Sequence, residues 1–291
     1  MFRGVYTALV TPFDENGGVD EEALRNLVDF QIENGISGLV PTGTTGESPT
    51  LTHEEHNKVV KTVIDQANGR VPVIAGTGSN STAEAIEMTR MAADAGADAT
   101  LQVTPYYNKP TQHALIQHFH TVANEGGLPV IVYNIKGRSG VNIETSTLLE
   151  MAENDNIIGV KEASGDIGQM MDVVRSTPSE FSVLSGDDNL AVPLMLMGGN
   201  GLISVLSNFL PREASNMINM ALEGNTEEAR RLHYHYMDLM KSMFIETNPV
   251  PVKAAMAMMG MITEKYRLPL VPMTSQNHEK LQRIMNAYEL I

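Results

Sequence analysis

The sequence has no cysteine and no tryptophan among its 291 residues. Without cysteine there are no disulfides, no thiolate nucleophiles and no cysteine metal sites. Cations are also scarce, because 20 Lys and Arg stand against 35 Asp and Glu, a formal net charge of −15. Proteins that bind nucleic acid or anionic membranes need a basic footprint, so this balance argues against both classes of partner.

Long hydrophobic runs are missing as well. No apolar run approaches the roughly 18 residues that a membrane span needs, and Met1 to Val5 show neither the charged region nor the apolar region of a secretory signal. We therefore expect a cytoplasmic protein with no membrane partner. The excess of acidic residues also implies that an anionic substrate must be held by a few local cations or backbone N–H groups.

What the sequence does contain is a regular alternation of apolar, β-branched runs with helical patterns. Continuous apolar strands alternating with helices are typical of a parallel sheet covered on both faces. Eight such units in residues 1–225 predict an α/β protein with a catalytic (β/α)8 TIM barrel rather than an open sheet. Residues 226–291, rich in methionine, predict a C-terminal extension of three helices. The expected strands are Gly4–Phe13, Ser37–Thr42, Val71–Gly76, Ala99–Thr104, Val130–Asn134, Ile157–Ala163, Phe181–Gly186 and Gly201–Leu206.

Helix-start signals support this register. Residues 52–55 and 81–84 both fit the capping box, in which a hydroxyl caps the third residue of the helix and a glutamate reaches back. Pro211 and Pro251 fall where prolines in the first helical turn are tolerated. The expected helices of the barrel are Glu21–Asn34, His53–Asn68, Thr82–Ala95, Gln112–Glu125, Thr145–Ala152, Ile167–Ser176, Asn189–Met197 and Arg212–Glu223.

The barrel interpretation directs attention to the C-terminal ends of the strands, where active residues of such barrels lie. Lys161 falls near the end of an otherwise apolar strand. Desolvation lowers the pKa of a lysine, and the neutral amine that results is what attack on a carbonyl requires. The alternative is a lysine that reaches the barrel rim or pairs with a carboxylate.

The ends of neighbouring strands carry further candidates. Tyr133 could relay protons beside an amine, or could simply fill the barrel. Gly43-Thr44-Thr45-Gly46-Glu47 could form a nest of backbone N–H groups for a carboxylate, or an ordinary glycine-rich turn. Arg138, flanked by glycines, could clamp a carboxylate or lie free on the surface. The paired aromatics Tyr106 and Tyr107 indicate a substrate wall or a subunit contact.

Other motifs do not support a cofactor or a metal. Residues 76–81 lack the third glycine of a dinucleotide fingerprint, and residues 198–201 precede a strand, which favours a helix C-cap at the bottom of the barrel. His113, His118 and His120 do not share one helical face, so we expect no metal site. Lys253 is a second candidate amine, but it lies outside the barrel strands near a predicted helix start, and we interpret it as structural.

Taken together, the strand-end segments resemble the dihydrodipicolinate synthase family essentially from end to end. The Gly-Thr-Thr-Gly-Glu motif and the lysine strand are typical of the wider superfamily of pyruvate-dependent lyases, and the double tyrosine and the loop arginine narrow the resemblance to the synthase. The segments that carry it are Gly43–Glu47, Pro105–Pro110, Tyr133-Asn134, Gly137–Gly140, Gly159–Ala163, Ser185–Asp188 and Asn248–Lys253.

This resemblance implies a class I lyase, without cofactor, that condenses pyruvate with L-aspartate 4-semialdehyde in lysine and diaminopimelate biosynthesis. Lys161 would form the Schiff base with pyruvate. Tyr133 would carry protons at the imine, coupled through Thr44 to Tyr107 of a neighbouring subunit, which implies at least a dimer and usually a homotetramer. The resemblance further assigns pyruvate orientation to Thr45 and to the backbones of Gly186 and Ile203, and the semialdehyde carboxylate to Arg138.

Some members of the family bind L-lysine as an inhibitor at a subunit interface, and the resemblance extends to those positions. One departure concerns the arginine loop, where Lys136 replaces the usual proline and Ser139 the usual threonine, which bears on the choice of aldehyde. Two alternatives remain: a sister enzyme, such as an N-acetylneuraminate lyase or a 2-keto-3-deoxy acid aldolase, and a non-catalytic pyruvate-binding barrel. The expected lysine-binding residues are Ser48, His53, His56, Asn80, Glu84 and Tyr106.

Overall fold

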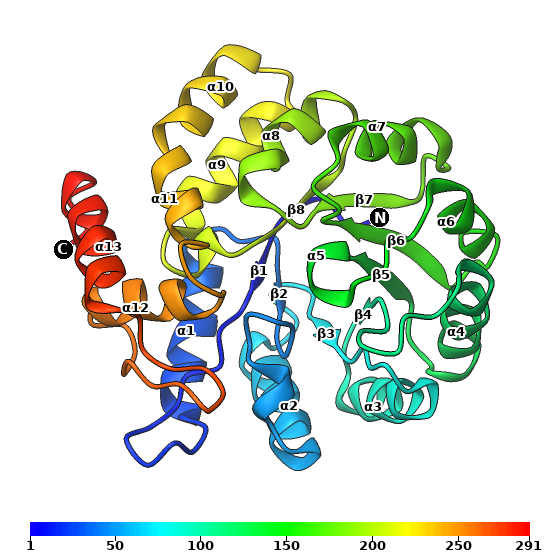
Figure 1. Ribbon diagram of the computed structural model, residues 1–291, viewed down its shortest axis with the longest axis horizontal. Coiled ribbons are helices and arrows are strands. Elements are labelled where there is room, and N and C mark those ends of the chain that lie inside the picture. The colour runs from blue at the N-terminus through cyan, green and yellow to red at the C-terminus, as the bar shows by residue number, and fades with distance from the viewer.

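The structure, a computed structural model, describes all 291 residues, and its centre is a barrel of eight parallel strands (Figure 1). The hydrogen-bonded order is β2-β1-β8-β7-β6-β5-β4-β3, and an isolated parallel bridge between Leu39 and Val73 brings the two end strands together. The predicted TIM barrel is confirmed. The strands are β1 (Gly4–Ala8), β2 (Gly38–Val40), β3 (Ile74–Gly76), β4 (Ala99–Val103), β5 (Val130–Asn134), β6 (Ile157–Glu162), β7 (Ser182–Ser185) and β8 (Gly201–Ser204).

Helices surround the barrel, as Figure 1 shows. None of them is both long enough and apolar enough to cross a lipid bilayer. Two short 3-10 turns, η1 (Ser48–Thr50) and η2 (Leu206–Asn208), follow β2 and β8. The helices up to residue 222 are α1 (Glu21–Glu33), α2 (His53–Ala67), α3 (Thr82–Ala95), α4 (Gln112–Glu125), α5 (Lys136–Ser139), α6 (Thr145–Met151), α7 (Ile167–Ser176), α8 (Asp188–Leu196) and α9 (Pro211–Leu222).

The first strand is shorter than its apolar run predicts. β1 ends at Ala8, although the run continues to Phe13. Leu9, Val10 and Phe13 are buried because they pack in the core outside the barrel, together with residues of the C-terminal helices. A sequence pattern that reports burial therefore extends beyond the residues that pair in the sheet.

The apolar core has two main parts and a small third cluster, made of Val60, Ala75, Ala92, Ala97 and Leu128. The larger part lies between the barrel and its helices. The smaller of the two main parts fills the barrel interior and is made of side chains that point inward from the strands, as expected for alternation along each strand. Its buried members are Tyr6, Ala8, Val40, Ile74, Ala99, Leu101, Ile131, Tyr133, Ala163, Leu184 and Ile203.

One of the two predicted capping boxes is present. Thr52 Oγ1 accepts from Glu55 N at 3.2 Å and Thr52 N donates to Glu55 Oε2 at 3.0 Å, as predicted. The second was wrong, because Ser81 makes no capping hydrogen bond. The Glu84 carboxylate instead contacts the side chains of Ser79 and His53.

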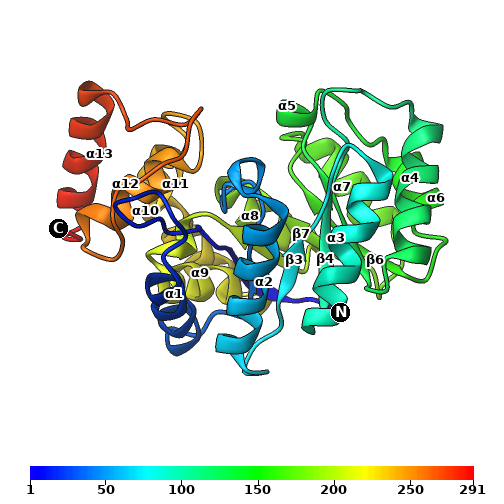
Figure 2. The same cartoon turned by 90° about the horizontal axis from the view of Figure 1, so that it is seen from below.

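The C-terminal extension contains four helices where the sequence predicted three, and the first two of them meet at Tyr236. Figure 2 shows the extension on one side of the barrel, with the segment after β1 (dark blue) running beside it. Pro211 and Pro251 lie in first helical turns, as predicted. The four helices are α10 (Thr226–His235), α11 (Met237–Ser242), α12 (Val250–Met258) and α13 (Ser275–Ala287).

Candidate active site

A cavity of about 440 Å³ opens at the C-terminal ends of the strands, where the barrel interpretation placed the active site. Five residues predicted from strand ends line it together although they are far apart in sequence. These residues are Thr44, Thr45, Tyr133, Arg138 and Lys161.

Lys161 lies at the penultimate position of β6 and is only 6% exposed. Its Nζ lies 4.1 Å from the centre of the Tyr133 ring, and it takes part in none of the ion pairs of the chain. Burial lowers the pKa of Lys161 to about 8, against the opposing effect of the carboxylates of Asp187 and Asp188. The amine is therefore available without a proton far more often than that of an exposed lysine.

The space beside the Lys161 side chain depends on a glycine. A Cβ at Gly186 would lie 3.0 Å from Lys161 Cε and 2.7 Å from Ala163 Cβ, so any larger residue would displace the amine. Gly186 follows β7, and its N–H donates to Glu162 O at 2.8 Å. Ile203, on β8, is fully buried in the barrel interior.

Tyr133 is the strand partner of Lys161, since the two residues face each other in the β5–β6 register. Burial raises the pKa of the Tyr133 hydroxyl, while Arg138 and the neighbouring Thr44 side chain act in the opposite direction. The phenol therefore keeps its proton at neutral pH and can act as a hydrogen-bond donor and proton carrier beside the amine.

The segment Gly43–Glu47 follows β2 and is held by contacts with other parts of the chain. Thr11 Oγ1 donates to Gly46 O at 2.7 Å, and Asn248 Nδ2 donates to Thr45 Oγ1 at 2.9 Å. Glu47 has φ +54°, which is uncommon for a residue other than glycine. This segment, which we call the Gly43–Glu47 loop, is therefore an ordered feature of the cavity wall.

Arg138 lies in a single helical turn, α5, where the sequence predicted a loop. Its Nη2 donates to Asn248 O at 3.1 Å. One residue of the C-terminal extension thus contacts both Arg138 and Thr45. No role for Asn248 was predicted from the sequence, where its only signal is its place in a motif segment that contributes no barrel strand.

The two tyrosines after β4 differ in their surroundings. Tyr106 is 39% exposed and lines the cavity, whereas Tyr107 is 90% exposed, has φ +73° and does not line the cavity of its own chain. Within one chain, the structure does not bring Tyr107 to Thr44.

The residues expected to bind lysine gather beyond the Gly43–Glu47 loop. His53 Nε2 lies 2.9 Å from Glu84 Oε1, and the buried His56 bonds to Gly76 O through Nε2 at 2.8 Å. Burial lowers the pKa of His56. Asn80 does not line the cavity, but its Nδ2 donates to Tyr106 O at 3.1 Å. The other five line the same cavity as Lys161: Ser48, His53, His56, Glu84 and Tyr106.

Asp187 is a candidate that the sequence analysis left without a role. It follows Gly186 directly, and burial raises the pKa of its carboxyl to about 6, against the opposing charge of Lys161. Asp188 is turned elsewhere, since it accepts from Ser204 Oγ at 2.5 Å and from Val205 N at 3.0 Å. The sequence signal that points to Asp187 is the segment Ser185–Asp188, which lies at the end of a predicted barrel strand.

The histidines of α4 do not converge on a common point. His118 Nδ1 bonds to Thr82 Oγ1 at 2.9 Å, and His120 Nε2 lies 3.3 Å from Met151 O. No group of three or more His, Asp or Glu side chains is arranged to hold a metal ion.

A parallel barrel with an unpaired, desolvated lysine at a strand end belongs to the class of TIM barrels whose cavity presents an amine to a carbonyl substrate. The sequence profile of the dihydrodipicolinate synthetase family matches residues 1–288. The chain belongs to this family.

Individual relatives agree with the profile. The chain is 53% identical to a 4-hydroxy-tetrahydrodipicolinate synthase of Syntrophus aciditrophicus over 291 residues, covering 100% of both chains. It also resembles a pyruvate complex of the dihydrodipicolinate synthase of Acinetobacter baumannii, with a TM-score of 0.98, 44% identity and 100% of both chains covered. A lysine-bound dihydrodipicolinate synthase of Cyanidioschyzon merolae has a TM-score of 0.97 and 44% identity, with 100% of this chain and 99% of that chain covered.

Proposed function

We propose that the chain condenses pyruvate with L-aspartate 4-semialdehyde, the activity of a 4-hydroxy-tetrahydrodipicolinate synthase, through a Schiff base on Lys161. One observation carries the proposal: Lys161 is buried, has no carboxylate partner and faces a cavity beside Tyr133. Family membership and the pyruvate complex of the Acinetobacter relative support the substrate. The same family places the activity in lysine and diaminopimelate biosynthesis.

The reaction begins when the neutral Lys161 amine attacks the ketone carbon of pyruvate. A C–N bond forms, the ketone oxygen leaves as water, and the resulting imine loses a methyl proton to become an enamine. The enamine carbon then attacks the aldehyde carbon of the semialdehyde. Finally, the amine of the bound semialdehyde unit attacks the imine carbon, closes the ring and displaces Lys161, which regains its free amine.

Each of these steps moves a proton, and Tyr133, whose ring centre lies 4.1 Å from the Lys161 amine, can carry it. Its raised pKa keeps the hydroxyl protonated until a transient alkoxide or amine forms beside it. Thr44 is the next link of the relay. The third link, Tyr107, would come from a partner subunit, which the 90% exposure of Tyr107 in the single chain supports.

The two substrate carboxylates need separate binding groups in a protein of net charge −15. Thr45 and the backbones of Gly186 and Ile203 would orient the carboxylate and carbonyl of pyruvate. Arg138, on the rim and anchored to Asn248 O, would bind the carboxylate of the semialdehyde.

Borohydride reduction in the presence of pyruvate tests the proposal. We expect intact-mass analysis to show one pyruvate-derived adduct on the wild-type chain and none on Lys161→Ala. The wild-type enzyme should then consume L-aspartate 4-semialdehyde faster than N-acetylmannosamine or glyceraldehyde, the aldehydes of the sister enzymes. An adduct on wild type that persists in Lys161→Ala would exclude Lys161 as the reacting amine.

We also propose that L-lysine inhibits the enzyme by binding at Ser48, His53, His56, Asn80, Glu84 and Tyr106. Support comes from the lysine-bound relative and from the continuity of the cavity, which joins five of these residues to Lys161. Glu84 supplies a carboxylate for an amino group of lysine. Activity should fall with millimolar L-lysine, and Glu84→Ala should remove the inhibition without lowering the uninhibited rate.

The assembly we propose is a homotetramer. Within each pair of subunits, Tyr107 of one subunit reaches the active site of the other. Sedimentation velocity over a range of protein concentrations gives the state directly. A chain that stays monomeric and fully active would exclude both the tetramer and the role of Tyr107 in the relay.

A further inference from the structure

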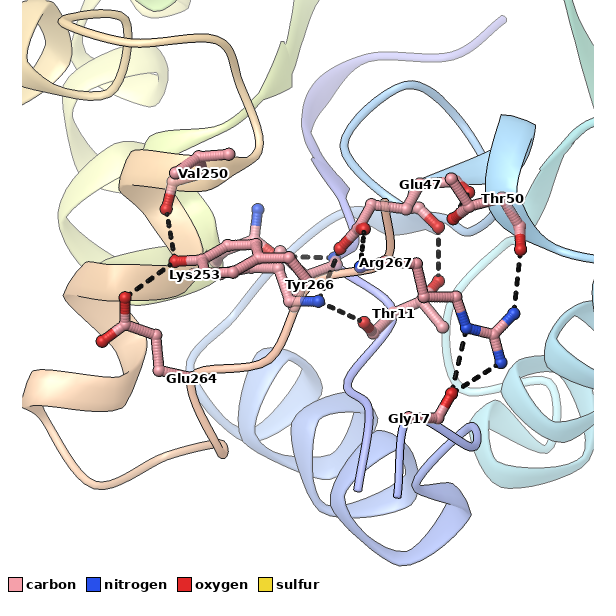
Figure 3. Close-up of polar contacts among 12 residues, drawn as sticks. Thr11, Gly17, Glu47, Thr50, Val250, Lys253, Glu264, Tyr266 and Arg267 are labelled. Atoms are coloured by element: carbon pink, nitrogen blue, oxygen red, sulfur yellow. Dashed lines mark hydrogen bonds and ion pairs between the residues drawn. The ribbon is translucent and has the colours of Figure 1, made fainter. Parts of the chain in front are cut away.

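The second buried lysine of the molecule, Lys253, lies in α12 of the C-terminal extension and has no exposed surface. Its Nζ donates to Glu47 Oε1 at 2.6 Å and to Thr11 O at 3.0 Å, and lies 4.2 Å from the centre of the Phe13 ring (Figure 3). Glu47 is also fully buried in this ion pair. Neither charge has access to water, so each depends on the other.

Glu47 is the last residue of the Gly43–Glu47 loop, and its backbone is left-handed, with φ +54° and ψ +35°. This conformation is unfavourable for a residue with a Cβ, and it persists only where the surroundings hold it. Figure 3 shows the Glu47 carboxylate between Lys253 and the Arg267 backbone, whose N–H approaches Oε2 at 3.4 Å. The side chain thus fixes the point at which the loop turns into η1.

Arg267 contacts the far end of η1, the turn that follows Glu47. Its guanidinium donates to Thr50 O at 2.9 Å, to Gly17 O at 2.8 Å and to both oxygens of Glu55. Its guanidinium also lies over the Phe13 ring that Lys253 contacts, with Cζ 4.5 Å from the ring centre. Lys253 therefore holds the end of the Gly43–Glu47 loop through Glu47, and Arg267 holds the turn that follows it through Thr50.

The middle of the same loop is held by the segment that carries Lys253. Asn248, five residues earlier, donates to Thr45 Oγ1 at 2.9 Å and accepts from Arg138 at 3.1 Å. Residues 248–253 consequently contact the loop at two points, Thr45 and Glu47, and contact Arg138 as well. A small movement of this segment would move the groups proposed for both substrate carboxylates.

We propose that Lys253 and Glu47 are positioning residues, and that their buried ion pair holds the Gly43–Glu47 loop in the conformation that binds the carboxylate of pyruvate. This inference rests on the proposed function. It gives the C-terminal extension a role in pyruvate binding, although the extension supplies no group that touches the substrate. A pair that served stability alone would leave the affinity for pyruvate unchanged in any variant that still folds.

The first test is Lys253→Met, which keeps the length of the side chain and removes its charge. Borohydride trapping at increasing pyruvate concentrations gives the half-saturating concentration, and steady-state rates give KM and kcat. We expect the half-saturating concentration and KM for pyruvate to rise by about tenfold or more, with a smaller fall in kcat, as misplacement of binding groups does. The same measurements on Glu47→Gln cover the case in which Lys253→Met does not fold.

The matched control is Gln31→Met, which removes another fully buried polar side chain. Gln31 hydrogen-bonds to Thr7 Oγ1, Ser207 O and Asn208 O, none of which belongs to the loop. It should lower the thermal midpoint without changing the half-saturating pyruvate concentration. Equal changes in Gln31→Met and Lys253→Met would show that any loss of a buried polar contact has the same effect, and the proposal would be overturned.

Rescue gives the sharpest readout. In the double variant Lys253→Met/Glu47→Gly, glycine accepts the left-handed backbone without help and leaves no unpaired carboxylate. We expect most of the pyruvate affinity to return. A lower thermal midpoint with unchanged pyruvate affinity in Lys253→Met and Glu47→Gln would overturn the inference alone, whereas the absence of any wild-type adduct would overturn the proposed function along with it.

Discussion

The two buried lysines of this chain show how the same side chain serves opposite purposes. Lys161 lies at a strand end against the ring of Tyr133, faces a cavity and has no ionic partner. Lys253 lies in α12, bonded to Glu47 and Thr11 and closed off from solvent. Burial lowers the pKa of both amines and nearby carboxylates oppose this at both sites, but only Lys253 forms a direct hydrogen-bonded ion pair with a carboxylate. An unpaired amine is available to react, whereas a paired one is held in place, and this contrast underlies the roles proposed for the two lysines.

If this contrast is correct, replacing each lysine by methionine should separate activity from stability. Lys161→Met should lose roughly 10³-fold or more in kcat/KM, because the nucleophile itself is absent. Its free energy of unfolding should not fall, since an apolar side chain replaces a desolvated amine without a partner. Urea unfolding and steady-state kinetics on one preparation check both statements. A Lys161→Met variant that keeps activity within tenfold of wild type would contradict the first.

Lys253→Met should instead lose stability while keeping the nucleophile. Removing one member of a buried ion pair leaves the other charge uncompensated, which costs about 3–5 kcal/mol of unfolding free energy. Some Schiff-base formation should remain at high pyruvate, because Lys161 is untouched. Urea unfolding followed by circular dichroism measures the loss. If Lys253→Met were as stable as Lys161→Met, the ion pair would contribute nothing and the contrast between the two sites would disappear.

The pH dependence sharpens the contrast at Lys161. The folded-state pKa is about 8 against an ordinary value of 10.5, so between these pH values the unfolded chain binds more protons than the folded one. Stability from this group therefore rises with pH across that window, and below pH 8 the charged amine costs about 3 kcal/mol. We expect the free energy of unfolding of the wild type to increase relative to that of Lys161→Met between pH 8 and pH 10.5. The rate of pyruvate trapping should increase as the pH is raised through about 8, where the Lys161 amine loses its proton. A stability difference that stays constant over this range would show that the amine keeps an ordinary pKa.

Much of this site was predictable from sequence because barrel topology assigns a location to every strand end. Lys161, Tyr133 and Thr45 lie at such ends, and the structure brings them to one cavity. The contribution of the C-terminal extension was not predictable in the same way. Asn248 and Lys253 lie about 200 residues from Thr45 and Glu47 in sequence, and no periodicity links them. The available signals were a lone cation in an apolar helix, a lone carboxylate in a glycine-rich loop, and the place of Asn248 and Lys253 in a motif segment that contributes no barrel strand.

The error at Ser81 has a similar origin. A capping box is a local pattern, but the Glu84 carboxylate contacts His53, 31 residues earlier, together with Ser79. The Glu84 carboxylate therefore bonds to the distant His53 and does not complete a capping box with Ser81. The helix α3 still begins where the pattern predicted, so its start does not depend on that cap.

A third lysine, Lys136, supplies the smallest expected effect because it is exposed and begins the single turn α5 that carries Arg138. The resemblance to the family favours proline at this position. The first position of a helical turn accepts proline, and Ile135 before it has φ −141° and ψ +81°, outside the helical region that proline disfavours in its predecessor. Lys136→Pro should therefore be stabilising by about 0.4–1 kcal/mol, through a less flexible unfolded chain. KM for L-aspartate 4-semialdehyde should change a few-fold while KM for pyruvate stays constant, because α5 carries Arg138 but not the Gly43–Glu47 loop. A change in the pyruvate KM of the same size would mean that the two carboxylate sites are not independent, and that Asn248, which contacts both, transmits the difference.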